Sequence, residues 1–343
     1  MAKEATLELD KPAEAPSRAP VWLKLLRLAR AHPLGVFGLL VVLLMTFCAV
    51  FADLIVPYDP EAIQAGPIKE GPSVSHPFGT DRLGSDVFSR TVFGARIAML
   101  IGLTSVILGM WMGSAIGIIS GYFGGFVDSL IQRLVDALLA FPAIVLLLAI
   151  IAVIGDEDSA VREFLRDSTP VPEGTVWGVP NFLDIIVISI GIGIAIAVGA
   201  ARVVRGAVLS LKENVYIEAA QAMGASDWRI MMRHILPNVA ALIVVLATIF
   251  LPIAILAEAA ISFLGIGVPA GTPSWGADMA GSNRQDAIDR GIWWVVFFPG
   301  LALSLVVLGF NLLGDSFRDI SDPRLRGGGT GGGSGGGARA SGF

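Results

Sequence analysis

Very few side chains in this sequence stand in a pattern that could perform catalysis. A phosphate-binding P-loop needs Gly-Lys-Ser/Thr, but none of the lysines, which are Lys3, Lys11, Lys24, Lys69 and Lys212, follows a glycine. The histidines, His32, His76 and His234, lie far apart and lack the His-x-x-x-His spacing of a zinc protease. The sequence therefore predicts neither an enzyme nor a metal or cofactor site.

Two carboxylates lie in or near long apolar stretches. Asp136 follows Arg133 by three residues, so a helix would bring the two side chains together, and we interpret Asp136 as structural. Glu258 lies deep inside an apolar stretch, where a charge is costly and often functional. Glu258 could line a translocation path and meet the ammonium group of a solute, or it could bond neighbouring helices or be protonated.

The composition indicates a polytopic membrane protein. Of the 343 residues 54% are hydrophobic and only 15% charged, and the mean hydropathy is +0.74, whereas soluble domains are about 45–50% apolar and about 25% charged. A helical span needs about 20 apolar residues, and the backbone can satisfy its hydrogen bonds in lipid only as a helix or a closed barrel. Six stretches qualify: 34–52, 97–121, 134–154, 185–201, 239–265 and 293–314.

Glycines recur in the second and fourth stretches and permit close approach of helices. They are Gly102, Gly109, Gly113 and Gly117, then Gly191, Gly193 and Gly199. We predict an all-α membrane protein that divides into a tail over 1–33, a first span and outer loop over 34–96, a core over 97–320 and a Gly-rich tail over 321–343.

Lys and Arg predict the orientation. With six spans both termini share one side, and that side holds two-thirds of the 24 Lys and Arg. Both termini and the loop 202–237 are therefore expected on the cytoplasmic side of a bacterial-type inner membrane. Loops at about 53–96, 155–184 and 266–292 then face outward. Their acidic residues include Asp156, Glu157 and Asp158. They either form a solvated surface or attract cationic solutes or a docking partner.

The loop 202–237 has the pattern of a helix, a turn and a second helix. Gly224 can take the left-handed conformation that ends a helix, Ser226 can cap the next helix through its side chain, and Pro237 suits the start of the following span. A short exposed helix with small residues can lie in a groove of another protein, although it could equally rest on the membrane surface. The residues of this candidate docking loop are Glu218, Ala219, Ala220, Gly224, Ala225, Asp227, Leu236 and Pro237.

This loop resembles the EAA loop of binding-protein-dependent ABC importers, with Glu-Ala-Ala at 218–220, Gly224 and Leu-Pro at 236–237. The ending Arg-His-Ile-Leu-Pro-Asn at 233–238 is similar to that of the dipeptide/oligopeptide subgroup. Further segments resemble its C-type permease subunits: 76–81, 86–90, 121–125, 136–142, 262–265, 273–276, 311–315 and 322–324. The resemblance covers about residues 21–326.

The resemblance implies a methionine-permease-like core with one added N-terminal span. It also implies a second permease subunit, two separate ATPase chains that receive the EAA loop, and an outer solute-binding protein. Peptides are the expected substrates, with nickel chelates or glutathione-like solutes as alternatives. Ser85, the segment 197–202 and the long acidic segment 155–183 depart from the usual pattern. The alternative of another class is a secondary transporter or channel, which would leave the EAA loop unexplained.

Overall fold

The computed structural model describes residues 30, 32–156, 159–168, 182–269 and 271–321. Most of the predicted tails, as well as Glu157 and Asp158, lie outside these residues. The described part is helical and contains no strand, which confirms the all-α prediction. Its helices are α2 Pro33–Val50, α3 Ala52–Ile55, α4 Val87–Phe123, α5 Gly125–Leu139, α6 Ala143–Ile154, α7 Ala160–Ser168, α8 Phe182–Lys212, α9 Val215–Ala222, α10 Asp227–Ile230, the π-helix η1 Met231–Ile235, α11 Leu236–Phe263, α12 Trp275–Asp278, α13 Gly281–Arg290 and α14 Trp294–Ser321.

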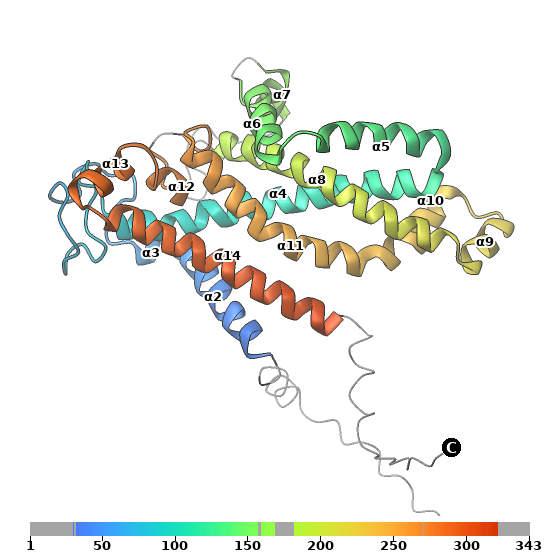
Figure 1. Ribbon diagram of the computed structural model, residues 1–343, viewed down its shortest axis with the longest axis horizontal. Coiled ribbons are helices and arrows are strands. Elements are labelled where there is room, and N and C mark those ends of the chain that lie inside the picture. The colour runs from blue at the N-terminus through green and yellow to red at the C-terminus, as the bar shows by residue number, and fades with distance from the viewer. Residues whose placement is uncertain (1–29, 31, 157–158, 169–181, 270, 322–343) are drawn as a thin grey trace, which may run out of the picture.

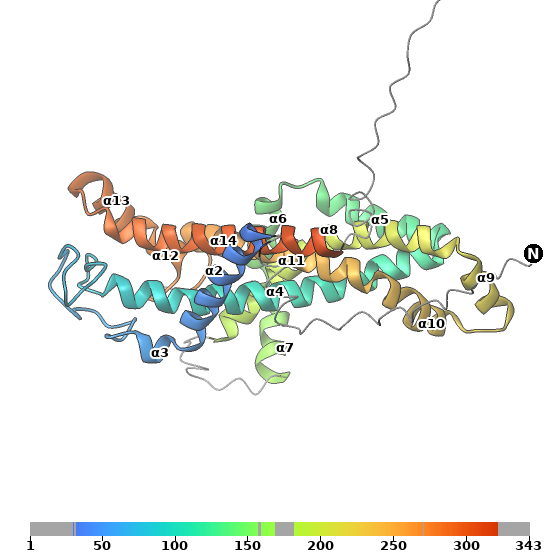
Figure 2. The same ribbon diagram turned by 90° about the horizontal axis from the view of Figure 1, so that it is seen from below.

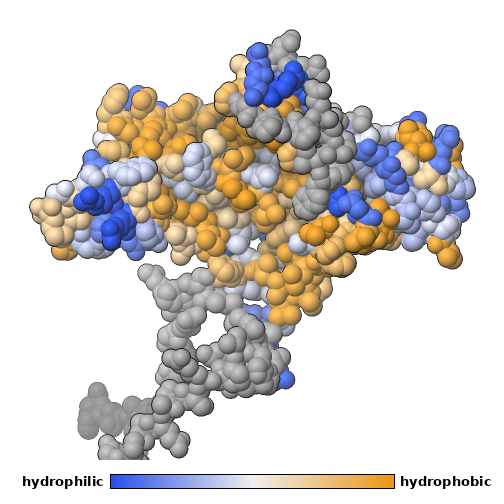
Figure 3. All heavy atoms as spheres, turned by 180° about the vertical axis from the view of Figure 1, so that it is seen from behind, coloured by the Kyte–Doolittle hydropathy of each residue, from blue (hydrophilic) through white to orange (hydrophobic). Residues whose placement is uncertain are grey.

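The long helices share one direction and give the molecule an elongated shape (Figures 1 and 2). Five of the helical stretches are long and apolar enough to cross a membrane, and α5 with α6 makes a sixth if the pair counts as one bent span. Hydrophobic residues predominate along the middle of the face in Figure 3, and hydrophilic residues gather toward the ends and over the projecting α6–α7 part. This distribution suits a protein that crosses a bilayer along its long axis.

The third predicted span is not one straight helix. The chain bends by 100° between α5 and α6, where Pro142 occupies the N-cap position of α6. Proline lacks an N–H and disfavours helical geometry in the residue before it, which favours a break of the helix at this point. As a result α6 runs across the bundle instead of along it (Figure 1).

The second predicted span also differs at its start. Helix α4 begins at Val87, before the apolar stretch, because the Asp86 side chain caps it by accepting a hydrogen bond from the Ser89 backbone N–H. Arg90 and Arg96, which were expected in an outer loop, therefore belong to the first turns of this helix.

Helices α4 and α8 pack closely along a seam of glycines, as the glycine spacing predicts. A Cβ atom added at Gly109, Gly113 or Gly117 of α4 would come within 2.6–2.7 Å of a backbone oxygen of α8. Because these glycines are four residues apart, they share one face of α4. The seam holds together the two helices that connect both ends of the molecule.

A compact unit closes the end of the bundle where α13 lies (Figure 2). We call it the cap, and it consists of residues 56–86 with α12 and α13. Lys69 forms an ion pair with Asp286 of α13 at 2.9 Å, and the indole N–H of Trp294 donates to the Thr80 carbonyl. The sequence shows only loops here, because α12 and α13 are short and polar.

Candidate coupling loop and transport path

Helix α9 lies at the opposite end of the molecule from the cap (Figure 1). Its C-cap residue is Met223. The next residue, Gly224, has a φ of +79° and thus forms the left-handed turn that the sequence predicts. Ser226 occupies the N-cap position of α10 but makes no side-chain cap bond. That part of the prediction is wrong: the backbone carbonyl of Ser226 accepts from the Ile230 N–H instead.

Helices α10, η1 and α11 form one continuous helical stretch, so Pro237 does not begin a separate span. The π-helical segment Met231–Ile235 lies directly before the Leu236-Pro237 step. Proline cannot donate to the carbonyl four residues earlier, and the ladder shifts locally, with the Leu236 N–H bonding to the Met231 carbonyl. The sequence did not indicate this feature.

Most of the predicted docking residues lie on the surface, and a few do not. Glu218, Ala219, Gly224, Asp227 and Pro237 are exposed, Ala225 and Leu236 are partly buried, and Ala220 is buried. Large apolar side chains beside them are also exposed, with Val215 at 79%, Met223 at 82% and Trp228 at 66%. Exposed apolar side chains in such a group are typical of a protein-binding surface.

A side-chain hydrogen bond connects this loop to α4. The Tyr122 hydroxyl, at the end of α4, donates to Asp227 Oδ1 at 2.6 Å. Lys212 Nζ, at the end of α8, donates to the Tyr122 carbonyl at 2.6 Å. The sequence analysis assigned Asp227 to docking and did not identify Tyr122 or Lys212, although Tyr122 lies in one of the segments that resemble the C-type subunits.

Ion pairs between α5 and α8 lie next to this connection. Asp128 accepts from Arg205 Nε at 2.6 Å and from the Ser120 hydroxyl at 2.5 Å. Asp136 pairs with Arg202 of α8 rather than with Arg133 of its own helix. The structural interpretation of Asp136 thus involves a different partner, one that joins two helices.

Glu258 is only 1% exposed. Its Oε1 accepts hydrogen bonds from the hydroxyls of Ser262 and Ser274, both at 2.8 Å. The Ser262 hydroxyl also accepts from the Val268 N–H at 3.3 Å, so the loop that follows α11 is held onto Glu258. Whether Glu258 meets a substrate stays a prediction.

Asp278 of the cap is also buried, as are Asp81 and Asp86. Burial raises the pKa of Asp278, and the neighbouring Arg90 opposes that shift. Arg90 donates from Nε to Asp278 Oδ1 at 2.9 Å and also reaches the Pro60 carbonyl at 3.0 Å. One guanidinium thus joins α4, α12 and the loop 56–86.

Two cavities lie where α6 crosses α8 and α11. One, of about 330 Å³, is lined by apolar residues such as Leu147, Ile192 and Ala257. The other, of about 460 Å³, contains charged residues and is bordered by α6, α7, α8 and the loop after α11. Among the described residues no group of His, Cys, Asp and Glu side chains could hold a metal ion.

A bundle of membrane-length helices, an exposed helical loop at one end and cavities between helices define a membrane permease. The chain belongs to the family of binding-protein-dependent transport system inner membrane components, whose model matches residues 113–327. Residues 21–72 match the N-terminal transmembrane domain of oligopeptide transport permease C.

Relatives of nearly equal length support the same conclusion. A glutathione transport system permease protein of Pectobacterium atrosepticum is 38% identical over 92% of this chain and 94% of its own. A putative peptide transport system permease protein of Brucella suis is 38% identical over 90% of this chain and 94% of its own. A dipeptide transport system permease protein of Alkalihalophilus pseudofirmus is 36% identical over 89% and 90%. The chain is therefore a permease subunit of an ABC importer.

Proposed function

We propose that this chain forms half of the translocation path of an ATP-driven importer of short peptides. A second, homologous permease subunit supplies the other half. Two ATPase chains bind on the cytoplasmic side, and an external solute-binding protein delivers the substrate. Both termini and α9 are cytoplasmic, so the cap faces outward. The names of the relatives support peptides as substrates, and glutathione, itself a peptide-like solute, is the second candidate because several relatives carry it in their names.

The observation that carries this proposal is the coupling loop, by which we mean residues 213–237. Its exposed apolar side chains are grouped around α9 and can enter a cleft of an ATPase subunit, as the resemblance to the EAA loop implies. The Tyr122–Asp227 bond then transmits the movement of the docked helix to α4. Because α4 and α8 are locked together by glycines, a shift at this end can reach the cavities between the helices.

The test is to replace Gly224 by valine. A valine Cβ would meet nothing within 4 Å, yet the φ of +79° is strained for a β-branched residue. Strain of ~1–3 kcal/mol is expected, so ATP-driven peptide uptake in reconstituted vesicles should fall about tenfold or more. The complex should still insert in the membrane.

Two variants serve as controls. Gly206→Val adds the same side chain in open space on α8, where φ is ordinary, and uptake should be kept. Gly224→Asn should lie between wild type and valine, because asparagine tolerates positive φ. Unchanged uptake in Gly224→Val would refute the docking role of the loop.

A further inference from the structure

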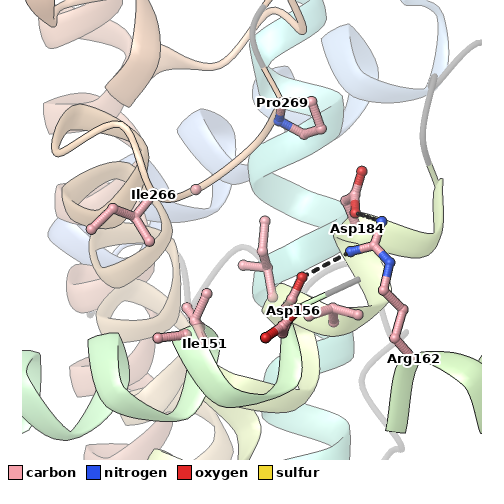
Figure 4. Close-up of a pocket in the computed structure, with 11 residues that line it drawn as sticks. Ile151, Asp156, Arg162, Asp184, Ile266 and Pro269 are labelled. Atoms are coloured by element: carbon pink, nitrogen blue, oxygen red, sulfur yellow. Dashed lines mark hydrogen bonds and ion pairs between the residues drawn. The ribbon is translucent and has the colours of Figure 1, made fainter. Parts of the chain in front are cut away.

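The larger cavity has the features of a ligand site. Its volume of about 460 Å³ lies within the range of about 300–1,000 Å³ of small-molecule sites. Figure 4 shows Asp156, Arg162 and Asp184 together on one side, with Ile266 and Pro269 of the loop after α11 opposite. The consecutive helices α6, α7 and α8 and the more distant loop after α11 thus bring charged and apolar groups to one hollow.

The charges in this cavity do not balance. Arg162 Nη2 pairs with Asp184 Oδ1 at 2.7 Å, and Arg162 Nη1 donates to the Gly155 carbonyl at 3.2 Å. Asp156 points toward the same guanidinium (Figure 4). Two carboxylates therefore share one arginine, which leaves one formal negative charge in excess. Such a site favours a ligand that brings a cation.

The remaining walls are apolar. Ile151, Val187 and Ile188 are buried side chains of α6 and α8 that border the cavity, and Ile266 and Pro269 face them. A compact cation such as a metal ion would leave these walls unused. An ammonium group attached to an apolar body would satisfy both kinds of surface, as in small-molecule sites in which a few polar groups orient a mainly apolar ligand.

The position of the cavity suits the entry of a transported solute. A Cβ atom added at Gly191 of α8 would come within 2.8 Å of Ile151 Cγ1 of α6, so the two helices touch at this crossing. One turn along α6, Leu147 lines the apolar cavity, which is bordered by the same α6, α8 and α11. The crossing at Gly191 thus separates the charged cavity from an apolar one.

We propose that the charged cavity binds the free amino end of a short peptide, with Asp156 and Asp184 receiving the ammonium group and the isoleucines contacting the first side chain. This inference rests on the proposed peptide import. It assigns to Asp156 and Asp184 the ammonium recognition that sequence analysis considered for Glu258, which does not border this cavity. It also gives a role to part of the acidic segment 155–183.

Protection of an engineered cysteine tests the site without transport. In the assembled transporter with Cys48→Ala, Ile266→Cys places a thiol in the cavity wall, since Ile266 is 47% exposed. A membrane-impermeant thiol reagent is added from the outer side of sealed vesicles without ATP or solute-binding protein. Alanyl-alanine and alanyl-alanine amide, which both carry an ammonium group, should slow the labelling. N-acetyl-alanyl-alanine should not.

Variants of the acidic residues identify the ammonium partner. Asp156→Asn leaves the Arg162–Asp184 pair in place, and it should raise the concentration of alanyl-alanine for half protection about tenfold. Asp184→Asn should do the same, and Asp167→Asn, on the exposed part of α7, should not. Equal protection by all three peptides, or none by any, would overturn the proposal.

The labelling result and the uptake result can fail separately. Protection by ammonium peptides alongside undiminished uptake in Gly224→Val would retain the site and reject the coupling loop. Loss of uptake in Gly224→Val without selective protection would retain the coupling loop and reject the site.

Discussion

The cap and the coupling loop differ in where their side chains find partners. In the cap, several charged groups pair within the chain: His76 Nδ1 lies 2.9 Å from Asp86 Oδ1, and Arg90 of α4 reaches both Asp278 and the Pro60 carbonyl. In the coupling loop the large side chains of Val215, Met223 and Trp228 point to the exterior. The cap exposes apolar side chains as well, such as Ile68 at 58% and Ile288 at 71%, so what distinguishes it from the coupling loop is its set of paired charges.

This difference follows from chemistry and not from helix content, since both units contain short helices. The cap has buried carboxylates, one of which pairs with Arg90 of α4, and buried charges are costly when unpaired and so define one arrangement when paired. The coupling loop contacts α4 through the Tyr122 hydroxyl, which donates to Asp227. Removal of a cap partner should therefore disturb folding, and removal of the loop contact should disturb function while the fold persists.

The largest effect is expected at Glu258, where the loop leading into α12 joins α11. Glu258→Leu removes the acceptor of the Ser262 and Ser274 hydroxyls. Leaving buried hydroxyls unpaired costs about 1–3 kcal/mol each, so the yield of assembled complex should fall strongly. Glu258→Gln keeps a carbonyl acceptor and should assemble normally. Complex yield after detergent extraction, together with vesicle uptake, measures both variants.

The same two variants decide between the roles that the sequence left open. If Glu258 lines the path, Glu258→Gln should assemble but lose uptake of substrates with a free amino terminus. If Glu258 holds the loop after α11, Glu258→Gln should transport normally. The burial of this carboxylate and its two serine partners favour the second result.

The sequence predicts the helical spans well because lipid leaves the backbone few alternatives. The glycine seam of α4 and α8 was also predictable, since regular spacing on one face is visible in sequence. The bend at Pro142 was not placed, because hydropathy measures how apolar a segment is and not its direction. The Tyr122–Asp227 bond joins residues far apart in the chain, and no local pattern reports such a contact.

The second effect, of intermediate size, concerns the hydrogen bond between Tyr122 of α4 and the coupling loop. Tyr122→Phe removes the hydroxyl that Asp227 accepts from and should cost about 1 kcal/mol. The complex should assemble and hydrolyse ATP, but the amount of peptide transported per ATP should fall several-fold, because the docked loop no longer moves α4 firmly.

A matched change in the same loop provides the control. Tyr216 is 42% exposed, and its hydroxyl has only a long contact of 3.4 Å with Asn238, so Tyr216→Phe should leave the transport-to-ATP ratio close to wild type. Equal ratios for Tyr122→Phe and wild type would mean that coupling does not pass through this bond.

The smallest effect is expected within the cap, at the ion pair between Lys69 and Asp286 near the surface. The hydrogen bond from Lys69 holds the pKa of Asp286 below its ordinary value. A carboxylate with a lowered folded-state pKa stabilises the fold fully above its unfolded-state pKa, of about 4, and loses that contribution as pH falls through the folded-state pKa.

Asp286→Asn should thus lower the melting temperature slightly at pH 7, and the difference from wild type should shrink below about pH 4. Asp289→Asn, on the same helix beside the neutral Gln285, should show a weaker dependence on pH. A difference for Asp286→Asn that grew on acidification would contradict the pairing of Lys69 with Asp286. It would also contradict the view that paired charges distinguish the cap from the coupling loop.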